Sequence, residues 1–179
     1  INIEAGTATG FGSDSLNSIE QIIGSRHDDT LIGSNNRDVI FGGFGDDIID
    51  LRSGDGNTVV GGSGQDTIQL GSGADILHYN NLSEGGDLIS GFTSGIDKIS
   101  LSNEIISGAF SEGFLDEGIF FKGSSEQIST SLDDNDRFIF NTDDSSLHFV
   151  SGGNGSEEAV EIATFDNNQL TNFDIFNVI

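Results

Sequence analysis

The chain of 179 residues contains no cysteine, proline, methionine or tryptophan. Without cysteine it can form neither a disulfide framework nor a thiolate metal site. Lysine and arginine together number only 6 against 30 aspartates and glutamates, which gives a formal net charge of −24. Proteins that bind nucleic acids or anionic membranes need a basic surface. The composition therefore excludes these two classes of partner.

Long apolar segments are also missing. A transmembrane helix needs about 18 or more consecutive apolar residues, and no such run occurs. The first residues do not show the charged and apolar regions of a secretory signal peptide, so we do not expect export through a signal at this end. Because the chain begins at Ile1, we expect it to be a fragment of a longer protein.

Glycine and aspartate recur on a nine-residue period between residues 24 and 78. The clearest copies read Gly-Gly-Phe-Gly-Asp-Asp-Ile-Ile-Asp (42–50) and Gly-Gly-Ser-Gly-Gln-Asp-Thr-Ile-Gln (61–69). The sixth positions hold oxygen-bearing side chains: Asp29, Asp38, Asp47, Asn57, Asp66 and Asp75. The eighth positions hold branched aliphatic residues: Leu31, Ile40, Ile49, Val59, Ile68 and Leu77. High acidity alone is typical of disordered chains, but carboxylates on a fixed period favour a cation-loaded repeat protein.

The register has one irregularity and several weaker extensions. The steps between sixth positions are 9, 9, 10, 9 and 9, so one residue is inserted between Leu51 and Val60. Asn57 in that copy keeps an oxygen but lacks a charge, which predicts weaker cation binding. Glu20, Asp87 and Asp97 also precede an aliphatic residue by two positions and are weaker candidates, because an isolated aspartate is equally typical of a turn.

This spacing suits calcium, which takes six to eight oxygen ligands from carboxylates, backbone carbonyls and water. Glycines at the first, second and fourth positions allow a tight turn that directs carbonyls inward. The following three residues form a short strand whose aliphatic side chain points to the interior. The candidate glycines are Gly24, Gly33, Gly42, Gly43, Gly45, Gly61, Gly62, Gly64, Gly71 and Gly73.

Two nonapeptides make one coil, so turns on the same edge recur every second repeat. One edge is predicted to carry Asp29, Asp47, Asp66 and Asp87, and the other Glu20, Asp38, Asn57, Asp75 and Asp97. Ions between successive turns would number about five to seven. Stacked carboxylates repel one another without the ion, which predicts that calcium binding is coupled to folding.

The composition changes near residue 101, where glycines become fewer and phenylalanines more frequent. Alternating segments 137–140 and 146–150 around a polar turn predict a β-hairpin, and 158–165 predicts a further strand. The segment 103–114 is compatible with a short helix. We therefore expect a β-roll over 1–101 and a C-terminal β cap, sandwich-like or rich in hairpins, over 102–179.

The repeats resemble the hemolysin-type calcium-binding (RTX) nonapeptides. Residues 91–101, 136–142 and 160–165 are similar to the C-terminal domains of serralysin-like exoproteins, and 170–179 is similar to an uncleaved type I secretion signal. The resemblance implies an all-β, right-handed parallel β-roll with several calcium ions. The first two copies depart from the family pattern, since Ser25, His27, Ser34 and Asn36 replace glycines.

The resemblance further implies a monomeric module of a larger protein that folds on calcium outside a Gram-negative-type bacterium. Its partners would be calcium and the type I secretion apparatus. The alternative is an adhesin module that binds a cell surface or a polysaccharide, although the outward residues show no regular ladder. No catalytic residue is expected, because the chain has neither a His-Glu-x-x-His motif nor a Gly-x-Ser-x-Gly elbow.

Overall fold

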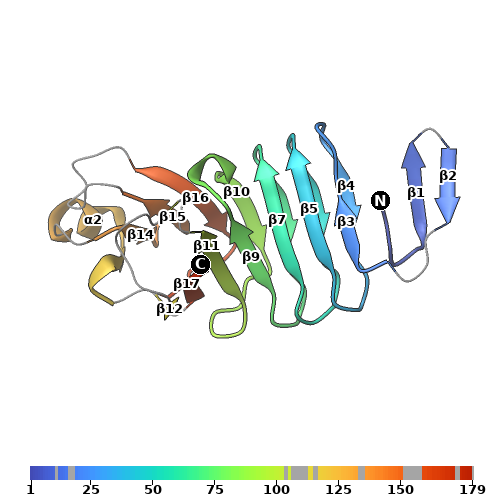
Figure 1. Cartoon of the computed structure of the whole chain (residues 1–179). Helices are drawn as coiled ribbons and strands as arrows, with labels where there is room; N and C mark the ends of the chain where they lie inside the picture. The colour runs from blue at the N-terminus through green and yellow to red at the C-terminus, as the bar shows by residue number, and fades with distance from the viewer. Residues whose placement is uncertain are drawn as a thin grey trace.

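The computed structural model describes residues 1–10, 12–15, 19–102, 105, 113–114, 117–132, 136–150, 159–171 and 174–178. Most of the strands stack along one axis, and the N-terminus lies beside β3 (Gln21–Ile23) and β4 (Thr30–Ile32) at one end of the stack (Figure 1). None of the helices in the described part of the chain has the length and apolar character needed to cross a membrane.

Residues 21–102 form a parallel β-roll in which successive strands alternate between two sheets. One sheet contains β3 (Gln21–Ile23), β5 (Val39–Phe44), β7 (Thr58–Ser63), β9 (Ile76–Tyr79) and β11 (Lys98–Ser102). The other contains β4 (Thr30–Ile32), β6 (Ile48–Asp50), β8 (Thr67–Gln69) and β10 (Asp87–Ser90). Ile22 pairs with Ile40, and Ile40 pairs with Val59. One coil therefore corresponds to two nonapeptides, and the predicted β-roll is confirmed.

The interior of the roll is a column of aliphatic side chains. All six predicted eighth-position residues, from Leu31 to Leu77, are 0% exposed. Ile89 and Ile99 continue the same column through the two looser coils. Each nonapeptide buries its aliphatic side chain only against neighbouring coils, so the stability of the roll depends on stacking.

The C-terminal part extends both sheets of the roll. The strands β14 (Phe138–Asn141) and β15 (Ser146–Phe149) form the predicted antiparallel hairpin. Next to them, β16 (Val160–Phe165) pairs with β15 and runs parallel to β10, while β17 (Ile175–Val178) runs parallel to β11. Both sheets and the core continue across residue 101, and the division into two domains there remains a prediction.

Phenylalanines close this end of the core. The rings of Phe92 and Phe165 lie edge to face with centroids 5.2 Å apart, and Phe140 contacts Phe165 at 6.1 Å. Asp174 ties the last strand to the roll, because it accepts hydrogen bonds from Ser94 Oγ (2.6 Å) and from the N–H of Gly95 (2.8 Å). Burial acts to raise the pKa of Asp174, but these hydrogen bonds outweigh it and hold the pKa below its usual value.

The remaining elements are short. They are β1 (Thr7–Gly10), β2 (Gly12–Ser15), η1 (Leu82–Glu84), β12 (Gly113–Phe114), η2 (Glu117–Ile119), β13 (Phe120–Gly123) and α2 (Ser125–Ser131). The sequence did not predict α2, whereas most of the helix considered over 103–114 lies outside the described residues. At the other end, Ile3 extends the sheet by donating its N–H to the carbonyl of Ile32 (2.9 Å).

Candidate metal centre

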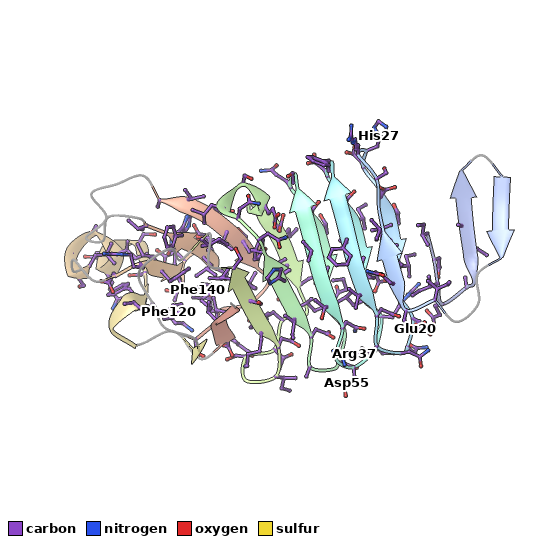
Figure 2. All side chains as sticks on the ribbon, in the orientation of Figure 1. Glu20, His27, Arg37, Asp55, Phe120 and Phe140 are labelled. Carbon is purple, nitrogen blue, oxygen red and sulfur yellow. The ribbon has the colours of Figure 1, made fainter. Side chains whose placement is uncertain are left out.

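The turns of the roll form two opposite edges. The first edge consists of the turns 24–29, 42–47, 61–66 and 80–87, and the second edge consists of 33–38, 51–57, 70–75 and 91–97. Figure 2 shows His27 on the first edge, with Glu20, Arg37 and Asp55 on the opposite side of the roll. The sixth-position residues thus form two stacked rows, here called ladders, with one ladder on each edge as the spacing predicted. Glu20 stands at the start of the second ladder with an exposed side chain.

Each ladder is held together by hydrogen bonds that the sequence did not reveal. The N–H of Asp29 donates to Asp47 Oδ1 (2.8 Å), and the N–H of Asp47 donates to Asp66 Oδ1 (2.8 Å). On the second edge the N–H of Asp38 donates in the same way to Asn57 Oδ1 (2.8 Å). Each of these side chains therefore uses one oxygen to accept a hydrogen bond from a backbone N–H of the preceding coil. A buried backbone N–H needs such a partner.

The ladder carboxylates are withdrawn from water. Asp38, Asp47, Asp66, Asp75, Asp87 and Asp97 are all at most 1% exposed. Burial raises the pKa of Asp47 to about 6, against the effect of the hydrogen bond from the N–H of Asp29. Burial likewise raises the pKa of Asp87 to about 7, and the neighbouring charge of Asp66 adds to that rise. Ionised carboxylates buried beside one another are unfavourable, and a cation on the ladder would offset that cost.

Two carboxylate oxygens on the first edge have no hydrogen-bond partner. Within the described residues, Asp47 Oδ2 and Asp66 Oδ2 are both fully buried and unpaired. Leaving a charged oxygen buried without a partner is costly, so native structures rarely do so without an ion or water. These two atoms are the strongest structural indication of a metal site.

The glycines of the same two turns leave space beside these oxygens. A Cβ atom on Gly42 would lie 2.3 Å from Asp47 Oδ2 and 2.3 Å from the carbonyl oxygen of Gly61. A Cβ atom on Gly61 would lie 2.2 Å from Asp66 Oδ2. A carboxylate oxygen and a carbonyl oxygen thus converge on a space that only glycine leaves open. This donor set fits calcium, which prefers hard oxygen ligands.

The other predicted glycines divide into two groups. Gly43, Gly45, Gly62 and Gly64 have positive φ values of 117°, 108°, 106° and 138° and stack closely on the preceding coil. Gly24, Gly33, Gly71 and Gly73 lie in turns without this positive-φ pair. Across the described residues, no group of three or more His, Asp or Glu side chains could hold a metal ion by itself. Backbone carbonyls must therefore complete any calcium site.

The parallel roll with periodic carboxylate turns defines a repeat protein of the calcium-binding type. Residues 23–57 and 53–81 match the family model of the RTX calcium-binding nonapeptide repeat, which spans four copies of the repeat. The segment 23–81 therefore consists of RTX repeats, and these repeats bind calcium.

Two solved structures show the same fold. The chain is similar to the AlgE6R3 subunit of the Azotobacter vinelandii mannuronan C5-epimerase, with a TM-score of 0.56, 19% identity, and 89% of this chain and 84% of that one covered. The AlgE6R2 subunit of the same enzyme gives a TM-score of 0.52 and 22% identity, with 89% and 93% covered. A search of curated proteins found no match.

Proposed function

We propose that this chain is a calcium-dependent folding module of a larger exported protein and that it carries a C-terminal signal for type I secretion. The observation that carries the proposal is the pair of buried, unpartnered oxygens on Asp47 and Asp66. A carboxylate pair of this kind is unfavourable until a cation occupies the edge. Folding and calcium binding are then one equilibrium.

The metal-binding residues proposed are ladder side chains of the first edge, foremost Asp47 and Asp66, and the glycine turns that frame them. Asp47 and Asp66 would supply carboxylate oxygens, and the carbonyl of Gly61 would supply a backbone ligand. When bound, calcium supplies positive charge that offsets the repulsion between stacked carboxylates. The net charge of −24 favours an expanded chain wherever calcium is scarce. Because calcium binds the folded form, it stabilises that form in proportion to RT ln(1 + [Ca²⁺]/Kd).

This mechanism suits a protein that leaves the cell unfolded and folds outside it. The proposed location is the extracellular space or the cell surface of a Gram-negative-type bacterium. The likeness to subunits of a mannuronan C5-epimerase supports a module that forms part of a longer protein. We assign the chain no catalytic role, and any activity would belong to another part of that protein.

Circular dichroism of the purified chain tests the folding switch. In chelator the spectrum is expected to be that of an unfolded chain, and millimolar calcium should restore a β spectrum with cooperative melting. Magnesium at equal concentration is the control, because it demands a smaller, octahedral site and should restore little structure. A β spectrum in chelator with the same melting temperature as in calcium would refute the switch.

A secretion assay tests the signal separately. Residues 102–179 fused to a passenger protein should be exported from a bacterium that has a type I exporter, whereas a fusion lacking 170–179 should stay inside. A fusion to residues 1–101 serves as the matched control, since it contains the repeats without the proposed signal. Equal export of the 1–101 and 102–179 fusions would show that the signal does not lie in the C-terminal segment.

A further inference from the structure

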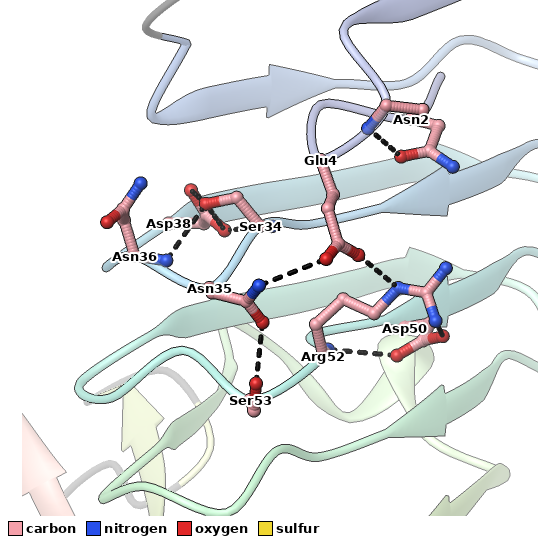
Figure 3. Close-up of polar contacts among 10 residues, drawn as sticks. Asn2, Glu4, Ser34, Asn35, Asn36, Asp38, Asp50, Arg52 and Ser53 are labelled. Atoms are coloured by element: carbon pink, nitrogen blue, oxygen red, sulfur yellow. Dashed lines mark hydrogen bonds and ion pairs between the residues drawn. The ribbon is translucent and has the colours of Figure 1, made fainter.

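The turns of the second edge are closed by their own hydrogen bonds. Asp38 Oδ2 accepts from the N–H of Ser34 (2.6 Å) and from its hydroxyl (3.0 Å), as Figure 3 shows. In the same way, Asp75 Oδ2 accepts from the N–H of Gly71 (3.0 Å) and Asp97 Oδ2 from the N–H of Thr93 (2.7 Å). Each of these carboxylate oxygens, which face the turn, already has a protein donor.

At the remaining turn of the second edge an amide group takes the place of a cation. Asn57 Nδ2 donates to the carbonyl of Gly54 (3.0 Å) and to Asp75 Oδ1 (2.9 Å). A carbonyl and a carboxylate of adjacent turns are the kind of ligands that calcium would bridge. The amide bridges them instead. Because it donates to the carboxylate of Asp75, this buried turn needs no cation to pair that oxygen, and Asn57 itself is 0% exposed.

The first edge differs in its two central turns. The residues four positions before Asp47 and Asp66 are Gly43 and Gly62, whose φ values are 117° and 106°. With this backbone conformation neither Oδ2 atom receives a hydrogen bond. The flanking turns are closed, since Asp29 Oδ2 accepts from the N–H of Ser25 (2.6 Å) and Asp87 Oδ2 from the hydroxyl of Tyr79 (2.9 Å).

The residue four positions before the aspartate contributes to this difference but does not decide it alone, because Gly71 also lies in a closed turn. Residues with a Cβ atom rarely adopt φ values near 110°, so a serine or threonine four positions before the aspartate favours the closed turn. Ser25, Ser34 and Thr93 occupy this position in three of the closed turns. Glycine there permits the open turn, which Gly43 and Gly62 adopt.

We infer that tight calcium binding is one-sided: it is confined to the first edge, around Asp47 and Asp66, while the second edge stacks on hydrogen bonds without an ion. This inference rests on the proposed function, because it takes calcium as the ligand of the roll. One ion for each open carboxylate gives about two tight ions. Two fully occupied ladders would instead hold about five to seven ions.

Native mass spectrometry of the full chain in limiting calcium counts the tight ions directly. Asp47→Asn and Asp66→Asn on the first edge are compared with Asp38→Asn and Asp75→Asn on the second. All four positions are buried sixth-position aspartates, and the first-edge pair lies in open turns whereas the second-edge pair lies in closed turns. The wild-type chain should hold two tight ions, each first-edge variant should lose at least one, and each second-edge variant should keep both.

Loss of a tight ion in Asp38→Asn or Asp75→Asn would overturn the one-sided arrangement and leave calcium binding itself intact. Retention of both ions in Asp47→Asn and Asp66→Asn would also overturn it. Absence of any tight ion in the wild-type chain would refute the proposed function as well. If a first-edge variant does not fold, the second-edge pair decides alone: two ions in both variants support the inference, and fewer in either one overturn it.

Terbium luminescence locates the ions without a change in the ladder. Tyr79 is the only tyrosine and tryptophan is absent, so a terbium ion excited through the protein in the tyrosine band must lie near Tyr79. Its hydroxyl contacts Asp87, which in turn accepts the N–H of Asp66 (3.0 Å) on the first edge. Emission that calcium displaces supports a first-edge site, and wild-type chain that binds terbium tightly without emission contradicts it.

Discussion

Replacing Gly62 with alanine is expected to abolish the calcium-induced β spectrum of the chain. The added Cβ would lie 2.1 Å from the carbonyl oxygen of Gly43 in the preceding coil, and the φ of 106° is itself strained for alanine. Neither backbone atom can give way, because ladder hydrogen bonds set the distance between coils at roughly 4.8 Å. The expected loss exceeds about 4 kcal/mol and is measured by circular dichroism and thermal melting in saturating calcium.

Gly95→Ala is the matched control for this substitution. Gly95 also has a positive φ, 81°, but a Cβ there would have nothing within 4 Å. Its variant should lose only the conformational cost, about 1–2 kcal/mol, and should still fold in calcium. Similar melting temperatures for Gly62→Ala and Gly95→Ala would show that the contact between Gly62 and Gly43 is unimportant for folding.

Much of the roll could be predicted because its geometry repeats along the sequence. A nine-residue period fixes both the strand and the turn, so the positions of Asp47, Asp66 and Ile68 followed from counting. The inserted residue in the copy at 51–60 changed only one turn, where Arg52 and Gly56 adopt φ values of 58° and 78°. The neighbouring strands kept their register, as the pairing of Ile40 with Val59 shows.

The state of each turn could not be predicted from the period alone. Whether a carboxylate is open or closed depends on backbone angles four positions earlier and on contacts such as Tyr79 with Asp87. The helix α2 was missed for a different reason. Its capping box is visible in the sequence, with Ser124 and Gln127 bonded to each other's backbone, but the helix contains no buried residue and hence no apolar periodicity.

The C-terminal segment illustrates a limit of composition. Its phenylalanines indicated a change of architecture, yet β16 and β17 continue the two sheets of the roll. Paired residues of β10 and β16 are 76 positions apart in the chain, and such a distant pairing leaves no local mark in the sequence. Sequence patterns located the strands, whereas only the structure shows which strands pair.

Asn57→Asp separates the sequence interpretation from the structural one. The repeat pattern alone predicts a gain, because aspartate restores the sixth-position carboxylate and should strengthen calcium binding. The structure predicts a loss of about 3–5 kcal/mol in the free energy of unfolding in saturating calcium. The new carboxylate loses the amide donor and faces both the carbonyl of Gly54 and the carboxylate of Asp75, in a position that is 0% exposed.

Chemical denaturation in calcium measures this loss, and Asn36→Asp is the matched control. Asn36 lies on the same edge and its replacement adds the same charge, but its side chain is exposed, so a change within about 0.5 kcal/mol is expected. A more stable Asn57→Asp variant with one additional tight ion would mean that the second edge accepts calcium once its carboxylate is restored. A destabilised variant with an unchanged ion count would instead mean that the amide of Asn57 takes the structural place of a cation.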